Sequence, residues 1–543
     1  MENETGKLSF DKLFLLSGIY ALLYTFCLYR NRMGLTFPVF VLGTAGLFLY
    51  YLRLTGRALK TGSALYLGGI LLLGLNVCLT SNEIVILFDK GFIFLLFFML
   101  FLHNLYDDST WDVSKYILSL CGCVLSSVKF LPRPVKDLGE YLRGRRAEST
   151  STSGVVCSAD AGVETTSGVV CSADAKETSG VVCYEKAKNS TTEVKATPEV
   201  AYPAGHVNSA ALYVLIGLGI SLPLLAVILP LLLSSDVIFQ DFFKNMFDFS
   251  LEVDPGAVLF MMIAVFVISY GMLCRFGQPM KYVAAPVTDK RKYSPVIAIT
   301  VNLVLLVVYL LYCGIQVIYL FLRQGTLPEG YTYSSYAHEG FFQLVFVCLI
   351  NIVLVLICRK YSADNLVLKS LFCLISACTY VMIASAAYRI YLYIAAYKLT
   401  FLRLYVLWAL AVMAVVMAGI IVYLFLPRMP FARFAAGVLV SLWMIFAYAK
   451  PDYQIAAYNI QYHDDDSYIM QLSFDAVPAI EKYDKSGKLL SNYFDYGYYP
   501  YYESTWTAGA LHGKKTSLRT WNYSLQKTYW IYDKYNAEQK SEM

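Results

Sequence analysis

Residues 385–403 read SAAYRIYLYIAAYKLTFLR and lie between two apolar runs, 367–388 and 405–426. Each run is long enough to cross the hydrocarbon core of a bilayer as a helix. On a helix of 3.6 residues per turn, four polar side chains advance by only about 40° per step and form one stripe: Ser385, Arg389, Tyr393 and Tyr397. The sequence therefore predicts a helical hairpin that turns near Thr400 and Arg403 and carries charge at the membrane boundary.

The two arginines of this hairpin allow two interpretations. An arginine near the end of a membrane helix is costly unless it is paired or hydrated, which makes it a candidate functional residue. Alternatively, Arg389 and Arg403 reach the interface with their long side chains and only tie two helices together. The stretch thus predicts either a functional polar site or arginines that only hold two helices together, and both interpretations stay open.

The composition places most of the chain in lipid. Of 543 residues, 58% are hydrophobic and 15% are charged, whereas soluble domains carry about 25% charged residues. The net charge of +5 is small, and no nucleic-acid partner is expected. The thirteen cysteines lack the close Cys/His spacing of a zinc site and are expected to be reduced thiols. No small-residue cleavage site follows the first apolar run, so the first helix is expected to remain as an anchor.

Apolar windows of about 17–25 residues predict eleven membrane-spanning helices. They cover 12–29, 35–53, 64–81, 88–105, 210–233, 257–275, 296–321, 341–358, 367–388, 405–426 and 434–449. Lysine and arginine are more frequent in one alternating set of connections, which includes Arg53, Arg57, Arg275 and Arg359. Because such residues favour the cytoplasmic side, the N-terminus is expected in the cytoplasm and the tail outside it.

The spans divide the chain into four parts, and the fold class is an all-α integral membrane protein. The parts are a four-helix membrane part at 1–108, a cytoplasmic connection at 109–209, a seven-helix membrane core at 210–450 and an extracytoplasmic tail at 451–543. The tail is polar, free of cysteine and rich in tyrosine. It is expected to be small and mostly helical, with helices near 453–460, 466–472, 476–483 and 522–537.

The connection at 109–209 has two halves of different character. Its first half places Trp111, Tyr116, Ile117 and Leu120 at helical spacing ahead of a basic stretch. It predicts an amphipathic helix on the membrane surface, attracted to anionic headgroups. The second half repeats TSGVVC three times among serine, threonine and alanine, which predicts a disordered low-complexity linker.

Standard catalytic signatures are absent from the sequence. It contains no phosphate-binding glycine loop followed by Lys-Ser or Lys-Thr, no His-Glu-x-x-His and no Gly-x-Ser-x-Gly. The run HDDD at 463–466 offers possible ligands for a divalent cation, but a solvated turn ahead of a helix explains it equally. We therefore predict no metal and no cofactor, and the absence of a signature favours a protein that is not an enzyme.

A second polar feature precedes the span at 341–358. His338 and Glu339 fall at the same membrane face as Arg389 and Arg403 under the predicted topology. Glu339 is then a suitable partner for one arginine, because arginine–carboxylate pairs are strong. His338 either titrates near neutral pH or caps the helix at the interface.

Six short motifs follow one another along the chain. They are LLLSSD ending at Asp236, YAHEGFFQL at 336–344, the stretch from Tyr393 to Arg403, PDYQIAAYN at 451–459, LSFDAVPA at 472–479 and TWNYS at 520–524. Together they resemble a bacterial integral-membrane family that is catalogued only as a domain of unknown function. The resemblance implies a polytopic helical protein of the bacterial cytoplasmic membrane and brings no reaction, substrate or cofactor. The chain has Lys398 where the family usually has glycine.

The predicted topology gathers polar residues from separate segments at the outer face, where they would form one composite surface covered by the tail. The candidates are Asp236, His338, Glu339, Ser385, Arg389, Tyr393, Tyr397, Thr400, Arg403, Asp452, Asn459 and Asp475. No catalytic residue is assigned among them.

Three classes of function remain open. The favoured hypothesis is a non-enzymatic membrane protein that binds an envelope protein or lipid-linked ligand at this surface, to sense or to scaffold. A transporter or flippase would hold an anionic or lipid-linked solute with Arg389 and Arg403 and move the proline-kinked span at 210–233. A membrane-embedded transferase or hydrolase would use an acid or base such as Glu339 or Asp475.

Overall fold

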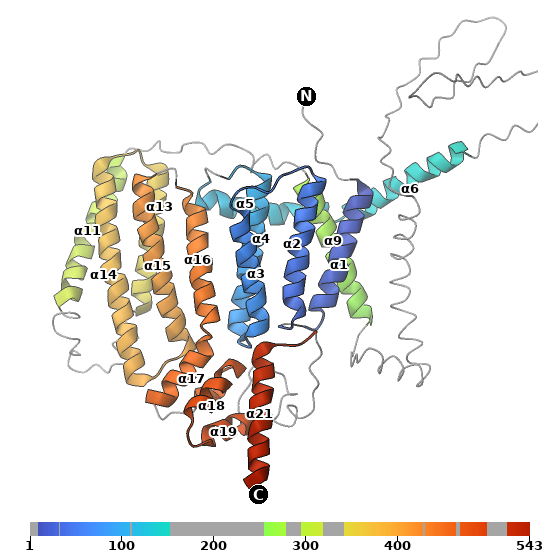
Figure 1. Ribbon diagram of the computed structural model, residues 1–543. Helices are drawn as coiled ribbons and strands as arrows, with labels where there is room; N and C mark the ends of the chain where they lie inside the picture. The colour runs from blue at the N-terminus through green and yellow to red at the C-terminus, as the bar shows by residue number, and fades with distance from the viewer. Residues whose placement is uncertain are drawn as a thin grey trace, which may run out of the picture. The chain divides into compact units, whose positions relative to one another are not determined.

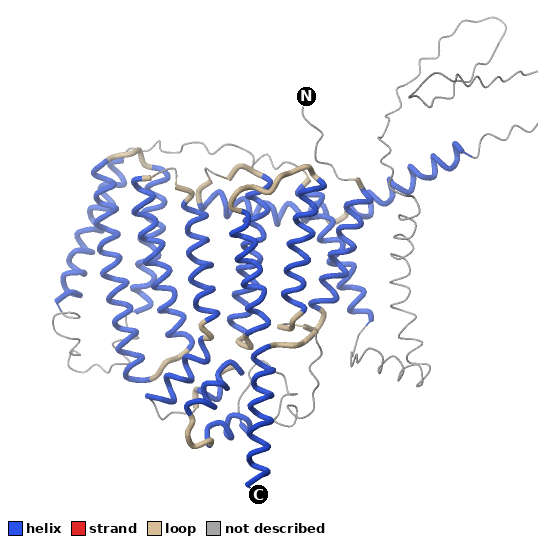
Figure 2. Tube along the Cα trace, in the orientation of Figure 1, coloured by secondary structure: helices blue, strands red, loops and turns tan. Residues whose placement is uncertain are grey.

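The computed structural model describes residues 9–31, 33–108, 111–152, 255–277, 295–318, 341–426, 429–462, 467–496 and 519–542. Within these ranges the chain consists of helices and connecting loops, without a strand (Figure 2). The chain divides into two compact units, one formed by 1–134 with 236–543 and the other by 135–235. The first unit contains both the membrane helices and the tail. Helix α6 (Arg133–Thr152) leads into the second.

Ten helices of the described ranges are long and apolar enough to cross a membrane, which confirms an all-α, multi-pass protein. Nine of them match predicted spans: α1 (Phe10–Leu28), α2 (Thr36–Leu54), α4 (Glu83–Leu105), α9 (Pro255–Phe276), α11 (Pro295–Gln316), α13 (Phe341–Tyr361), α14 (Leu366–Tyr397), α15 (Phe401–Phe425) and α16 (Phe431–Tyr448).

The remaining predicted spans have different outcomes. The window 64–81 forms α3 (Ser63–Leu79), which at 17 residues is shorter than the ten candidates. The window 210–233 lies outside the described residues. The tenth candidate by length and composition, Val113–Phe130, contains α5 (Val113–Ser127) and the short η1 (Val128–Phe130), which the sequence predicted as a surface segment.

The membrane helices of the first unit pack in a continuous series (Figure 1). Helix α9 packs on α1, α1 on α2, and α2 on α3, which contacts both α4 and α16. Helix α16 packs on α15, α15 on α13 and α14, and α14 on α11. Close packing of α15 with α16 needs Gly419, where a Cβ would lie 2.1 Å from a ring atom of Phe434.

Helix α4 tolerates an acidic residue because neighbouring helices supply hydrogen bonds. Asp89 is fully buried. It accepts hydrogen bonds from Asn76 Nδ2 of α3 and Trp443 Nε1 of α16, each at 2.7 Å. A buried polar group in lipid needs such internal partners. The triad thus ties three helices together.

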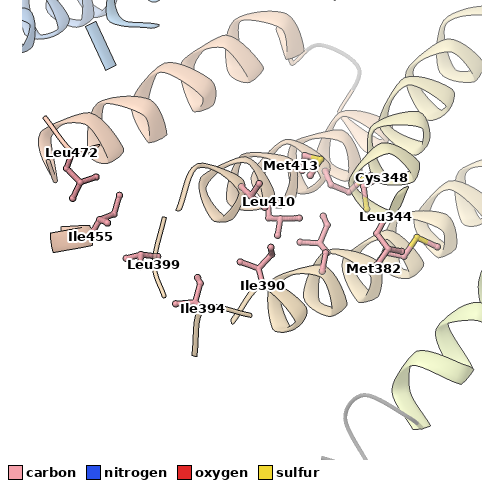
Figure 3. Packing of buried hydrophobic residues seen from close by; sticks show 14 of the residues in the cluster. Leu344, Cys348, Met382, Ile390, Ile394, Leu399, Leu410, Met413, Ile455 and Leu472 are labelled. Carbon is pink, nitrogen blue, oxygen red and sulfur yellow. The ribbon is translucent and has the colours of Figure 1, made fainter. Parts of the chain in front are cut away.

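The tail folds as short helices at the end of the bundle where α16 ends (Figure 1). They are α17 (Pro451–Tyr462), η3 (Ile469–Gln471), η4 (Phe474–Ala476), α18 (Val477–Tyr483), α19 (Lys488–Tyr496) and α21 (Tyr523–Glu542). The mostly helical tail is confirmed. One apolar cluster runs from α13, α14 and α15 through Leu399 to Ile455 and Leu472 of the tail, so the tail shares its core with the membrane helices (Figure 3).

Candidate functional site at the junction of the tail and the membrane helices

The α3–α4 turn is the central element of the junction. Its three polar residues, Thr80, Ser81 and Asn82, are all buried. Asn82 caps α4, since its Oδ1 accepts a hydrogen bond from Val85 N at 3.0 Å. This leaves Asn82 Nδ2, the Thr80 hydroxyl and the Ser81 hydroxyl directed at the tail.

Asp475 is the main partner of this turn. Its carboxylate accepts hydrogen bonds from the Thr80 hydroxyl and from Ser81 N, the latter at 3.2 Å. In return, the Ser81 hydroxyl accepts a hydrogen bond from Asp475 N at 3.1 Å. Lys450 Nζ lies 3.5 Å from the other carboxylate oxygen. A buried carboxylate with these donors and one cation satisfies its charge inside the protein.

Asp452 is the second carboxylate of the junction. It accepts hydrogen bonds from Asn82 Nδ2 at 2.8 Å and from Ser473 N at 3.1 Å. Burial raises the pKa of Asp452, and the neighbouring charge of Asp475 acts in the same direction, against the opposing effect of its hydrogen bonds. Asp452 therefore favours its neutral form more than a carboxyl in water.

The start of α21 makes a further attachment to the same turn. Asn522 Nδ2 donates to Thr80 O at 2.9 Å and lies 3.2 Å from Met33 O in the α1–α2 turn. Its Oδ1 accepts from Ser524 N at 3.0 Å. The hydroxyls of Ser524 and Ser81 are 3.2 Å apart. Segments from four parts of the sequence therefore meet at one buried polar cluster.

The α14–α15 turn is held separately by the tail. Asn459 of α17 forms a pair of hydrogen bonds with Leu399, accepting from its N at 2.8 Å and donating to its O at 2.9 Å. The Tyr468 hydroxyl accepts from Phe401 N at 2.9 Å. Lys398 has φ 151° and ψ 166°, a backbone region that essentially only glycine occupies without strain. This is the position where the family resemblance predicts glycine.

The predicted stripe on α14 divides into two groups. Ser385 and Arg389 are buried, and both donate to Gln316 Oε1 of α11, at 2.7 and 3.3 Å. Arg389 lies 20 residues after Lys369, which is about 30 Å along a helix and equals the thickness of the hydrocarbon core. Arg389 of this group lies eight residues before the end of α14.

The second group surrounds the turn. The rings of Tyr393 and Tyr397 contact each other with centroids 5.2 Å apart, and the Arg403 guanidinium lies 3.9 Å from the Tyr393 ring centroid. Arg403 also donates to Lys398 O. Thr400 occupies the residue before α15 without a side-chain capping bond. Arg403 thus stabilises the turn by a cation–π contact and a backbone hydrogen bond.

The structure changes the expected character of the site. Asp452, Asn459 and Asp475 are buried and bonded within the protein, so they join the tail to the membrane helices instead of lining an open surface. Asp236, His338 and Glu339 lie outside the described residues, as does the run at 463–466. Among the described residues, no group of three or more His, Cys, Asp or Glu could hold a metal ion.

Sequence reasoning missed the partners of these residues. The α3–α4 turn carried a signal in its run of three polar residues between two apolar windows. Gln316 belongs to a polar row on α11 with Asn302 and Tyr309, each seven residues apart, in which Asn302 and Gln316 are buried and Tyr309 is partly buried. The Tyr309 hydroxyl donates to Asn351 Oδ1 of α13 at 2.7 Å, and Asn351 Nδ2 donates to the Thr379 hydroxyl of α14 at 2.9 Å. The row therefore joins three helices inside the membrane part.

The fold and the buried junction define a multi-pass α-helical membrane protein with a helical tail built onto its bundle. The chain belongs to the family DUF4153, described as a domain of unknown function, whose model matches residues 67–483. This range begins in α3 and ends with α18, so it contains the α3–α4 turn, Asp452 and Asp475. No curated protein and no solved structure matches the chain.

Proposed function

We propose that this protein is a non-enzymatic binding protein of the bacterial cytoplasmic membrane, with its N-terminus in the cytoplasm and its tail outside. The tail would bind an envelope protein or a lipid-linked ligand, to sense it or to hold it at the membrane. The observation that carries this proposal is the buried junction of Asp475 and Asp452 with the α3–α4 turn. A tail joined this firmly presents a defined surface and transmits a load on that surface to the membrane helices.

The exposed face of the tail offers suitable binding groups. Tyr462 on α17 and Trp530 on α21 are 69% and 61% exposed. Lys534 lies near the Trp530 ring and pairs with Glu481 at 3.0 Å. Exposed aromatic side chains next to cations are common at protein interaction sites.

The test uses a photo-crosslinking residue placed singly at Tyr462 or Trp530 of the full chain in cells. We expect crosslinked products at one or both positions. The same residue at Asp495, which is exposed on α19, is the control for unspecific capture. Products that are equal at all three positions, or absent at 462 and 530, would contradict the proposal. Reporter fusions at positions 362 and 398 and after the tail test the orientation.

Transport of an anionic or lipid-linked solute is a second candidate, favoured by the polar row of α11 with Arg389 at its end. Polar side chains inside a membrane bundle are costly and often mark a pathway. Flux of inorganic phosphate into vesicles that contain the full chain tests it. A Gln316→Leu variant should lose flux, whereas Gln454→Ala, an exposed change in the tail, should keep it.

A further inference from the structure

Helix α5 runs across the ends of the membrane helices (Figure 1). At its start, Asp112 pairs with Lys360 Nζ, 2.7 Å away in the last turn of α13. Beyond its middle, the hydroxyl of Ser126 accepts a hydrogen bond from Arg275 Nε at 2.7 Å, in the last turn of α9. A helix that meets the same end of two separate spans crosses that end.

A network around Asp108 holds α5 in this direction. Asp108 is buried and accepts a hydrogen bond from the Tyr116 hydroxyl of α5. Arg433 at the start of α16 lies 3.4 Å from the Asp108 carboxylate, and His103 Nδ1 lies 2.9 Å from it. Asp112, Ser126 and, through Asp108, Tyr116 thus make polar contacts with the ends of α13, α9 and α16. Its composition alone suits a span, but its contacts place it across the bundle end.

The two faces of α5 differ. One face is buried against the protein and carries Tyr116, Ser119, Cys123 and Ser127. The opposite face is apolar and 42–70% exposed: Ile117, Leu118, Val124, Leu125 and Val128. We call these five residues the α5 stripe. Their spacing follows one side of a helix.

Two exposed cations follow the stripe. Lys129 comes directly after its last residue and Arg133 four residues later, and the Arg133 guanidinium lies 5.6 Å from the Phe130 ring centroid. Apolar side chains beside cations, on a helix that crosses the ends of membrane spans, match the chemistry of a leaflet surface. Lysine and arginine at such a surface attract anionic phospholipids at short range.

We propose that α5 lies in the headgroup region of the leaflet at which α1 begins, with the α5 stripe in the acyl chains and with Lys129 and Arg133 bound to the phosphates of anionic phospholipids. This interaction is independent of the function proposed for the tail. Because α5 contacts α9, α13 and α16, lipid binding to α5 would stabilise the positions of these three helices relative to one another.

The first arm of the test measures depth in the membrane. A spin-labelled residue is placed singly at Leu118, Leu125 or Val128 of the full chain in phosphatidylcholine vesicles. We expect three similar, shallow depths in the acyl region, against a deep reference at the exposed Leu303 of α11. A spanning helix would instead separate positions 118 and 128 by about 15 Å. That result, or three labels in water under a protein partner or a second copy, would overturn the proposal.

The second arm measures lipid preference. The thermal stabilisation of the full chain by phosphatidylglycerol over phosphatidylcholine is titrated for wild type and for a Lys129→Gln/Arg133→Gln variant. We expect the apparent affinity for phosphatidylglycerol to fall roughly tenfold. A Lys485→Gln/Lys488→Gln variant, which removes two exposed cations from the tail, should keep the wild-type preference. An unchanged affinity in the first variant, or an equal loss in both, would overturn the assignment to anionic phospholipid.

Discussion

A buried aspartate with a hydroxyl donor and a nearby cation lies at each end of the membrane bundle. At the tail end, Asp475 accepts from the Thr80 hydroxyl and faces Lys450 at 3.5 Å. At the other end, Asp108 accepts from the Tyr116 hydroxyl and faces Arg433 at 3.4 Å. The chemistry is the same at both ends: the carboxylate accepts a hydrogen bond from a hydroxyl and forms an ion pair with a partly exposed cation.

The two aspartates differ in the length of chain that they close. Asp475 joins residues that are 395 positions apart and lie in the tail and the membrane part. Asp108 takes its hydroxyl donor from eight residues away and His103 from five, and its distant partner Arg433 belongs to the membrane helix α16, not to the tail. Loss of Asp108 should therefore release one helix. Loss of Asp475 should weaken the docking of the whole tail, which the apolar core shared with the membrane helices would still hold in part. The comparison separates an aspartate that holds one helix, α5, from an aspartate that docks the whole tail on the membrane helices.

The largest effect is expected for Asp475→Ala. The change leaves the Thr80 hydroxyl, Ser81 N and Lys450 without their acceptor. Docking of the tail should therefore become weaker by about 3 kcal/mol. Pulse proteolysis of the full chain should show faster cleavage between 451 and 496. Asp495→Ala removes an exposed carboxylate of the same tail and is the control. Equal protection in both variants would contradict the role of Asp475.

Asp108→Ala should destabilise by about 2 kcal/mol, with the effect confined to α5 and its neighbours. The Tyr116 hydroxyl and Arg433 lose a buried acceptor, so hydrogen exchange should rise in 111–127 and stay unchanged in the tail. If hydrogen exchange in the tail rises equally, the structures at the two ends of the bundle are not independent of each other, which would contradict the comparison.

A smaller, opposite effect is expected for Lys398→Gly. Glycine adopts the backbone angles of Lys398 without strain, so the α14–α15 turn should gain about 1 kcal/mol. Thermal unfolding of the full chain measures this gain. Lys398→Ala removes the same charge and keeps the strain, so a gain of equal size in that variant would assign the effect to charge.

The smallest effect depends on pH and concerns Asp452. Its pKa is raised in the folded protein by burial, so the folded state holds the proton more tightly than the unfolded chain. The contribution of Asp452 to docking stability should therefore be greatest at low pH and be lost as pH rises from about 3.9 through its raised pKa. Asp452→Asn should remove this component, so its stability relative to wild type should increase between pH 4 and pH 8. A difference that is constant over this range would show that Asp452 does not titrate in docking.

The sequence predicted nine of the ten candidate membrane helices among the described residues, and it singled out three polar residues of the tail. Spans are predictable because length and hydrophobicity are local properties that the bilayer demands of each segment. Asp452, Asn459 and Asp475 were recognised as polar residues at the end of the bundle where the tail begins. Their partners were not, because a hydrogen bond between residues hundreds of positions apart leaves no trace in one sequence.

Orientation was the other limit. The stretch at 113–130 is apolar enough to span, and its amphipathic spacing also suits a surface helix. The contacts with Lys360 and Arg275 and the network around Asp108 favour the surface helix. Likewise, the polar stripe on α14 was predictable from the sequence. The hydrogen bonds of Ser385 and Arg389 to Gln316 were not, because they depend on α11 packing beside α14.

The seven-residue spacing of Asn302, Tyr309 and Gln316 has a consequence for the assembly of α11. Apolar surfaces in lipid slide past one another at little cost, because every position offers similar contacts. Three polar groups at equal intervals of about 10 Å match their partners on α13 and α14 in one alignment. A shift of one helical turn breaks all three matches, and the next alignment, seven residues away, restores only two. The three polar groups of the row therefore determine both the depth and the rotation of α11 relative to α13 and α14.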